Sequence, residues 1–377
     1  MNRLYILLYV ITLCFSLQMI SCIAPDLHLP EQTEPSVLPA IETELSVVWD
    51  IDAEWTADWY YGWDEKDDSI WGGIGYDMPK SFQVRRYYTG DDPHAPHTDV
   101  DAFSIEGTSF RRLFSFGYYD MLFWSDIDSK DGTQVLVINE QMDSVTATTT
   151  GTHGLARSIF QLVGSNESVG ESEIIGLKNQ PEIFYSAYTE DVLISRDLND
   201  YIYDPVEDVY IKKIETELKP LVYIYLVQVV LFNNDGRIKG TNGNTAMSGM
   251  ASGTNLNTGK TNNSPSVVYF NTRLKRNIEV EGRNSDVIGG KFTTFGLCTR
   301  SQLVNYLLFD LVFTNDGVKT YSVDVTEQCQ SQPHGGVITV FVDCGQLVLP
   351  DDPEIGTGSL FIPTIEDYKI VNWEVEL

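Results

Sequence analysis

The sequence is poor in the residue types that most often carry chemistry. Its 377 residues include only five cysteines and five histidines, and 25 basic residues stand against 54 acidic ones. No Cys-x-x-Cys pair occurs, which argues against a zinc or redox site, and no Gly-x-Ser-x-Gly elbow supports a catalytic triad. The net charge of -29 argues strongly against nucleic acid as a partner, because phosphate backbones bind to basic surfaces.

Long apolar runs are scarce as well. The apolar stretch 4–17 follows Arg3 and is too short to cross a bilayer, so it reads as an export signal. It ends close to Ser21 and Cys22, and a small residue before a cysteine resembles a bacterial lipoprotein signal. We therefore predict a signal peptide over residues 1–21 and a lipid on Cys22 that ties the chain to the outer membrane. An ordinary secretory signal with a chance cysteine is the alternative.

The first part of the mature chain has little apolar periodicity. Residues 22–44 contain several prolines and acids, which is typical of an extended tether. Order is expected from Leu45, where apolar residues alternate with polar ones as far as Ala53. This alternation predicts a half-buried strand.

The rest of the chain is dominated by short apolar or alternating runs separated by Gly, Asp and Pro. Short helices fit only at 141–149 and 154–162, and no segment has a sustained helical period. The pattern predicts an all-β protein built from sandwiches. Further strands are expected at 81–89, 109–116, 118–124, 134–139, 266–270, 277–281, 291–297, 306–313, 318–325, 337–342 and 370–377.

The length suggests two domains, 45–195 and 196–377, separated near residue 195 where a polar, tyrosine-rich connection begins. The run 221–232 is apolar at every position except Gln228, which predicts a central strand covered on both faces. The polar stretch 240–264 is expected to be a long connection between strands with a turn of helix.

Two Asn-Asp-Gly triplets mark expected turns. They stand at 234–236 and 315–317, each after an apolar run. Asp-Gly suits a two-residue hairpin, whose two central residues need positive φ. Both triplets therefore predict hairpins.

Two acidic loops contain residue types that can bind metals. His94 and His97 lie among aspartates and prolines, which favours a solvated loop over a metal site. Residues 126–132 resemble a calcium loop, but Lys130 occupies a ligand position and Val137 stands where the final glutamate belongs. We interpret them as an acidic hairpin turn between strands 118–124 and 134–139, and predict neither a metal nor a cofactor.

Three cysteines lie in the globular part of the chain, Cys298, Cys329 and Cys344. Strand-like runs on either side of a turn make a bridge between Cys329 and Cys344 possible, but their spacing does not require it. Buried free thiols and one bridge both stay open.

Five of the seven tryptophans fall between residues 49 and 71, together with tyrosines and many acids. Aromatic faces beside carboxylates are typical of sugar-binding platforms, because ring faces stack on sugars and acids bind their hydroxyls. A long loop wrapped onto the sandwich explains the same residues more simply. If a glycan binds here, the candidate residues are Trp55, Trp59, Tyr61, Trp63 and Trp71.

Several segments together resemble one family. Cys22, the run LVYIYLVQVVLFNND (221–235), the segment AMSGMASGTNLNTG (246–259) and the ending IEDYKIVNWEVEL resemble the Bacteroidales fimbrillin-associated anchor lipoproteins and related uncharacterised lipoproteins. The resemblance implies two tandem transthyretin-like Greek-key sandwiches and a non-enzymatic role in anchoring or assembling type V fimbriae at the cell surface. It also implies fimbrial subunits as partners, with polymerisation by strand donation. A surface glycan-binding lipoprotein is the alternative function.

The resemblance also bears on Cys22. Stalk subunits of that family lose their lipidated N-terminus to a protease that cuts after basic residues. This chain has no Lys or Arg between Cys22 and Lys66. Cys22 is therefore expected to be a permanent attachment, which favours an anchor over a polymerising subunit.

Overall fold

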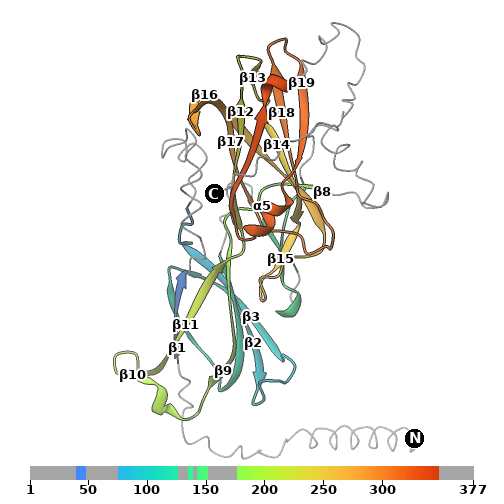
Figure 1. The fold of residues 1–377 in the computed structure, drawn as a ribbon. Helices are drawn as coiled ribbons and strands as arrows, with labels where there is room; N and C mark the ends of the chain where they lie inside the picture. Colours follow the sequence, from blue (N-terminus) through green and yellow to red (C-terminus); the bar gives the residue numbers. More distant parts are fainter. Residues whose placement is uncertain (1–39, 48–74, 126–134, 139–141, 152–175, 348–377) are drawn as a thin grey trace, which may run out of the picture.

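The fold is that of a computed structural model, which describes residues 40–47, 75–125, 135–138, 142–151 and 176–347 (Figure 1). These residues form an all-β protein of two large sheets joined by a small one. The predicted sites at Cys22 and at Trp55, Trp59, Tyr61, Trp63 and Trp71 lie outside the described residues, as do segments 126–132 and 370–377.

The first unit, as we call the eight-stranded sheet, has the strand order β3-β2-β5-β9-β11-β1-β4, with β10 paired to β11. β1 begins at Ala40, so the strand starts before the expected end of the tether at residue 44. The strands are β1 (Ala40–Val47), β2 (Ser81–Gly90), β3 (Asp99–Glu106), β4 (Ser109–Leu113), β5 (Gly117–Ser125), β9 (Tyr185–Ile194), β10 (Ile202–Asp204) and β11 (Val209–Pro220).

The second unit is the nine-stranded sheet, with the order β13-β18-β14-β16-β17-β12-β20, β19 on β18 and β8 on β16. Among its described residues, the one α-helix is α5 (Thr326–Ser331), which connects β19 to β20. The strands are β8 (Gly176–Lys178), β12 (Tyr223–Phe232), β13 (Ile238–Gly240), β14 (Asn244–Ala251), β16 (Pro265–Val280), β17 (Arg283–Thr294), β18 (Tyr306–Phe313), β19 (Val318–Asp324) and β20 (Gly336–Asp343).

A three-stranded sheet at the junction of the two units has the order β15-β7-β6. Its strands are β6 (Val135–Ile138), β7 (Thr146–Thr149) and β15 (Gly253–Asn255). β5 pairs with β2 and β9, whereas β6 pairs with β7. The predicted hairpin that joins 118–124 to 134–139 through 126–132 is therefore wrong, and the expected helix at 141–149 is instead a 3-10 turn followed by β7.

The apolar run 221–232 contains β12, whose alternate side chains enter two different cores. One set of alternate residues, including Tyr225, Val227 and Val229, belongs to the closed core of the second unit. The other set, including Leu226 and Val230, belongs to a core that continues into the first unit. The prediction of a central strand covered on both faces is confirmed.

The second unit has a core of its own, whereas the first does not. The core of the second unit is lined by residues of β12, β14, β16, β17, β18 and β20. The two other core clusters both combine residues of the first unit with residues that follow Pro220, such as Ile224 in one and Phe295 in the other. The first unit therefore packs by sharing its apolar surface with its neighbour.

The stretch 240–264 was predicted as a connection, and this prediction is wrong. It forms β14 and β15, and Met247 and Met250 of β14 are fully buried. The small residues mislead because they serve close packing: a Cβ on Gly249 would lie 2.4 Å from the side-chain nitrogen of Asn305. Gly249 also has a positive φ of 77°, at a bulge where the register of β14 against β16 shifts.

The two Asn-Asp-Gly turns behave differently. At 315–317 the predicted hairpin is confirmed, because β18 pairs with β19 on either side of it. At 234–236 the positive φ values expected for Asp235 and Gly236 are present. However, β12 pairs with β17 and β20 rather than with the following β13, so no hairpin forms there.

The chain leaves the first unit later than residue 195. β10 and β11 follow that position, and both belong to the first sheet, where β11 pairs with β1 and β9. The passage into the second unit therefore falls at Leu221 and Val222. The tyrosine-rich connection looked like a linker because its polar residues surround the short β10. The division into two independent domains stays a prediction.

No helix in the described ranges is long and apolar enough to cross a membrane.

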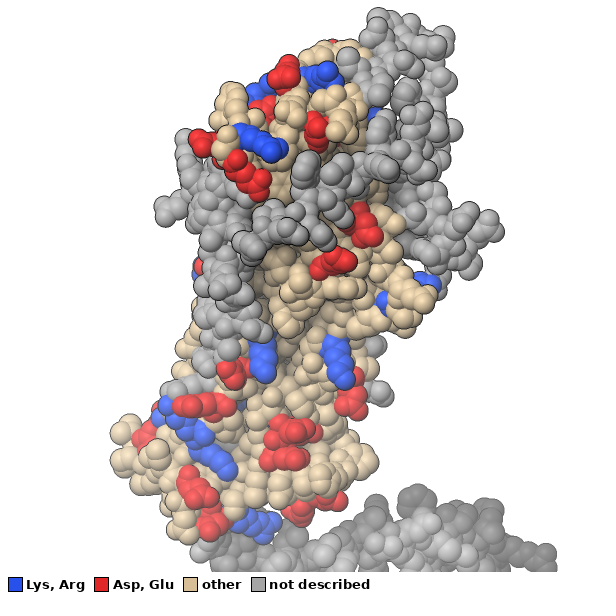
Figure 2. All heavy atoms as spheres, in the orientation of Figure 1, with Lys and Arg blue, Asp and Glu red and all other residues tan. Residues whose placement is uncertain are grey.

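On the face seen in Figure 2, acidic and basic side chains are interspersed over the first unit rather than gathered by sign.

Candidate ligand cleft at the junction of the units

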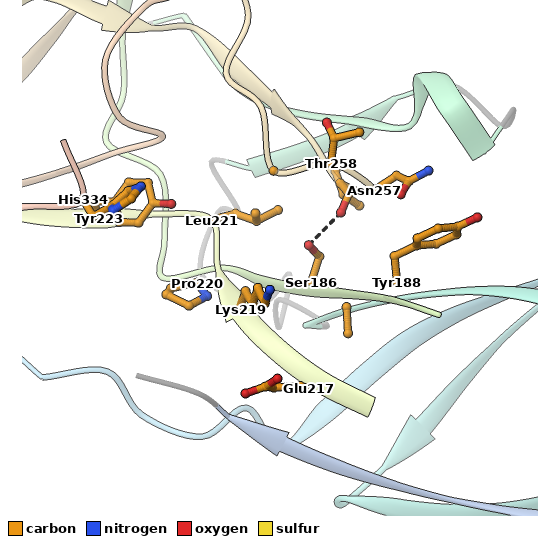
Figure 3. A pocket seen from close by; sticks show the side chains of 13 residues that line it. Ser186, Tyr188, Glu217, Lys219, Pro220, Leu221, Tyr223, Asn257, Thr258 and His334 are labelled. Atoms are coloured by element: carbon orange, nitrogen blue, oxygen red, sulfur yellow. Dashed lines mark hydrogen bonds between the residues drawn. The ribbon is translucent and has the colours of Figure 1, made fainter. Parts of the chain in front are cut away.

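A cleft of about 610 Å³ lies where the chain passes from the first unit to the second (Figure 3). One wall comes from the ends of β9 and β11, which pair so that Lys219 stands opposite Ser186. The other walls come from the start of β12, the turn after β15 and the loop before β20. The lining residues are Ser186, Ala187, Tyr188, Glu217, Lys219, Pro220, Leu221, Tyr223, Leu256, Asn257, Thr258, Gly259 and His334.

The turn after β15 is held in place by local hydrogen bonds. The side-chain oxygen of Asn255 accepts the backbone N–H of Thr258 at 2.8 Å, and the Thr258 hydroxyl donates to it at 3.0 Å. The Ser186 hydroxyl donates to the Leu256 carbonyl at 2.8 Å, which ties the turn to β9. Asn257 and Thr258 are thereby fixed at the mouth of the cleft.

A glycine positions the opposite wall. Gly335 has a φ of 99°, and a Cβ there would lie 2.5 Å from the carbonyl oxygen of Ile224. Only glycine tolerates both the positive φ and this close approach. The loop can therefore lie against β12, where the His334 ring packs on Tyr223 with centroids 4.9 Å apart.

The cleft offers aromatic surfaces at two ends and polar groups between them. Figure 3 shows Tyr223 with His334 on one side and Tyr188 on the other. Burial raises the pKa of the Tyr188 phenol, and the nearby carboxylates of Asp120 and Glu190 raise it further. Its hydroxyl therefore stays protonated and can donate at neutral pH.

Among the described residues that line the cleft, Ser186 and His334 are not arranged as a catalytic pair. The Ser186 hydroxyl is used by the Leu256 carbonyl, and His334 is paired with an aromatic ring on the opposite wall. Within the described parts of the chain, no group of three or more His, Cys, Asp or Glu side chains could hold a metal ion. The cleft is suited to binding through hydrogen bonds and ring faces.

The structure also places the two histidines and the three cysteines that were singled out in the sequence. His97 Nε2 lies 2.9 Å from the buried Asp120 carboxylate, and its ring packs on Tyr87, so it is half-buried, whereas His94 is exposed. Cys329 and Cys344 are free and fully buried, and Cys298 is free and half-buried. The open question of a bridge is therefore answered in favour of free thiols.

The cleft itself was not predicted. Its residues come from segments between Ser186 and His334 that are brought together only by sheet pairing. The one local signal is the Pro-His-Gly-Gly sequence at 333–336, between Cys329 and Cys344, which predicts a turn but not the wall of a cleft.

No protein-family model and no curated protein matches the chain. Among solved structures, a proposed adhesin of Bacteroides ovatus aligns with a TM-score of 0.49 and 13% identity, over 85% of this chain and 94% of the other. A proposed polysaccharide-binding protein of Bacteroides thetaiotaomicron aligns with a TM-score of 0.43 and 7% identity, over 81% and 91%. The fimbrial anchor protein Mfa2 of Porphyromonas gingivalis aligns with a TM-score of 0.39 and 12% identity, over 80% and 90%.

Proposed function

We propose that the chain is a non-enzymatic, lipid-anchored surface protein that serves as an anchor or accessory component of type V-like fimbriae. The three likenesses above have TM-scores below 0.5, so the proposal rests on the chain's own sequence and geometry. One observation carries it, namely the way in which the first strand is held in the sheet.

β1 is inserted between two neighbours. It pairs in parallel with β11 from Ala40 opposite Ile211 to Val47 opposite Leu218, and it pairs antiparallel with β4. In Figure 1, β1 and β11 run side by side along the first unit toward the second. The first strand after the tether is therefore fixed by hydrogen-bond ladders on both sides.

This pairing defines a path for tension. A lipid on Cys22 would pull the chain at Ala40, at the start of β1. A load on the second unit would pull β11 at Pro220, the opposite end of its neighbour. Because β1 and β11 are parallel, the two forces slide one strand along the other and load the hydrogen bonds together rather than one after another. A sheet joined in this way resists the loads that an anchor bears.

The sequence before β2 supports permanent attachment. Neither the tether nor β1 contains Lys or Arg, so a protease that cuts after basic residues has no site between Cys22 and Lys66. In the family that the sequence resembles, such a cut releases stalk subunits. Its absence here fits an anchor.

The second unit offers an edge for a partner strand. Among the described strands, β20 pairs only with β12, so its other edge presents backbone groups for strand addition. We propose that fimbrial subunits are the partners, and that the two units correspond to the transthyretin-like sandwiches implied by the resemblance.

Membrane fractionation tests the proposal. The Cys22→Ala variant of the full chain should leave the outer-membrane fraction, while the matched Cys298→Ala variant should stay in it. Fimbrial subunits should co-isolate with the retained protein. If the Cys22→Ala variant remains membrane-bound, or if the native protein is isolated from membranes of a strain without any fimbrial subunit, the anchor function is wrong.

A second candidate function is glycan binding, which the junction cleft favours through its paired aromatic surfaces. Hydroxyl, amide and charged side chains line the cleft between Tyr188 and Tyr223. The aromatic faces can stack on a sugar ring while the polar groups bind its hydroxyls, so the cleft suits an uncharged saccharide. A glycan array should then show binding that is lost in Tyr188→Ala. Binding lost instead in Trp59→Ala or Trp63→Ala would assign the glycan to the tryptophan-rich segment, and no binding to any glycan would contradict this function.

A further inference from the structure

The β10 hairpin, by which we mean residues 202–211, exposes apolar side chains at the end of the first unit. Val206 is 91% exposed, Ile202 69% and Tyr203 47%. In Figure 1 the hairpin projects from the end of the first unit that lies away from the second. Large apolar side chains exposed together on a loop mark a surface that contacts something else.

The acidic groups in and beside the turn of the hairpin are paired with donors of the protein. Arg111 donates to the carboxylates of Asp204 at 3.0 Å and Glu207 at 2.9 Å. The Tyr203 hydroxyl donates to Asp208 at 2.6 Å. These contacts give each of the three carboxylates a donor of the protein, and Val206 stands exposed between them.

The hairpin lies beside the point at which the tether enters the fold. In the sheet, Ile202 stands opposite Ile211, Ile211 opposite Ala40, and Ala40 opposite Leu113. Adjacent strands are about 4.8 Å apart, so Ile202 lies about 10 Å from the start of β1. Leu113, on the other side of Ala40, is 56% exposed. Exposed apolar residues thus stand on both sides of the entry point.

The length of chain before Ala40 limits how far this end can be from a lipid on Cys22. A random coil of that length would have a root-mean-square span of about 24 Å, and a fully extended chain would reach about 60 Å. β1 runs from Ala40 toward the junction, so the second unit lies farther from the attachment. If a lipid holds Cys22, the β10 hairpin is at the end of the described protein nearer the attachment.

We propose that the β10 hairpin contacts the lipid surface in which Cys22 is anchored, with Ile202, Tyr203 and Val206 entering the interfacial region. The inference rests on the lipid attachment proposed above. An exposed set of three side chains is too small for a stable protein interface, but bilayer interfaces accept exposed aliphatic and aromatic side chains. The strong negative charge of the chain gives no attraction to anionic lipid, so the tether supplies the local concentration that makes this weak contact persist.

Lipid-depth quenching tests the contact in the full lipidated chain. A Val206→Cys variant in a Cys298→Ser background would carry an environment-sensitive fluorophore and be reconstituted in phosphatidylethanolamine and phosphatidylglycerol vesicles. Val318→Cys, at an exposed position of β19 in the second unit, is the matched control. We expect a blue shift and quenching by spin-labelled lipid at position 206 and neither at 318.

The outcomes separate the two proposals. A chain that floats with the vesicles while position 206 is not quenched keeps the anchor and overturns the hairpin contact. Shielding of position 206 that depends on protein concentration, without lipid quenching, assigns the tip to a second copy and also overturns it. A chain that does not float with the vesicles overturns both the anchor and the contact.

Discussion

The two units differ in how their cores are closed. The second unit surrounds a core made only of its own residues. In this core the ring centroid of Phe292 lies 5.2 Å from that of Tyr225 and 4.8 Å from that of Phe270. The first unit buries its apolar side chains in two clusters that both extend into residues beyond Pro220. We therefore expect the second unit to keep its core when the first unit opens, whereas the core of the first unit depends on the second.

The largest effect should come from the closed core. Phe292→Ala removes a fully buried ring together with its contacts to Tyr225 and Phe270, and should cost about 3–5 kcal/mol. Because the first unit depends on β12, both units should lose protection in hydrogen exchange together. Phe341→Ala, at a ring that is 38% exposed, is the matched control and should have a small effect. Loss of the second unit alone would contradict the dependence.

A comparable change in the first unit should stay local. Phe123 is fully buried in β5 and faces the shared core. Phe123→Ala should destabilise the first unit by about 3 kcal/mol, and exchange should rise in β2, β5 and β9 while β14 and β18 remain protected. If β14 and β18 open equally, the second unit is not independent.

A smaller effect is expected at the contact of the His334 loop with β12. Gly335→Ala introduces a methyl group against the Ile224 carbonyl at a positive φ, which should cost about 1–3 kcal/mol. Gly240→Ala is the control, because a Cβ there meets no atom within 4 Å. Denaturant unfolding of both variants measures the difference. Equal stability of the two variants would show that the loop does not depend on this close approach.

The smallest effect at neutral pH involves the two buried thiols of the second unit. Burial raises the pKa of Cys329 and Cys344 to about 12. The folded thiols keep their protons while unfolded thiols ionise above about pH 9, so the free energy of unfolding should be unaffected below pH 9 and fall from there toward pH 12.

The control is the double variant Cys329→Ala and Cys344→Ala, in which the free energy of unfolding should not show this fall between about pH 9 and pH 12. Both thiols should resist a thiol reagent in the folded protein. Rapid modification at neutral pH would contradict the closed core of the second unit.

The sequence predicted strands well where burial and pattern agree. β12 and β18 were located from their apolar runs, and β2 from its alternation. β14 was missed because the packing of Asn305 against Gly249 selects small residues, which resemble a loop.

Pairing between distant strands could not be predicted from local pattern. β16 was expected as two strands, at 266–270 and 277–281, but is one long strand that pairs with β14 at one end and with β17 along the other. β10 and β11 follow residue 195 in the sequence but pair within the sheet of the first unit, and the junction cleft depends on the pairing of β11 with β9. Local sequence does not encode which strand becomes the neighbour of β1.

We propose that β1 and β11 bear the load between a lipid on Cys22 and the second unit. Single molecules can be pulled between Cys22 and a handle attached after Leu347, where the described second unit ends. The measurement compares the force that ruptures the first unit in the native chain and in the Thr43→Pro variant. Proline removes a ladder hydrogen bond in the middle of β1. The account predicts a clear drop in the force at which the first unit ruptures, whereas an unchanged rupture force would contradict it.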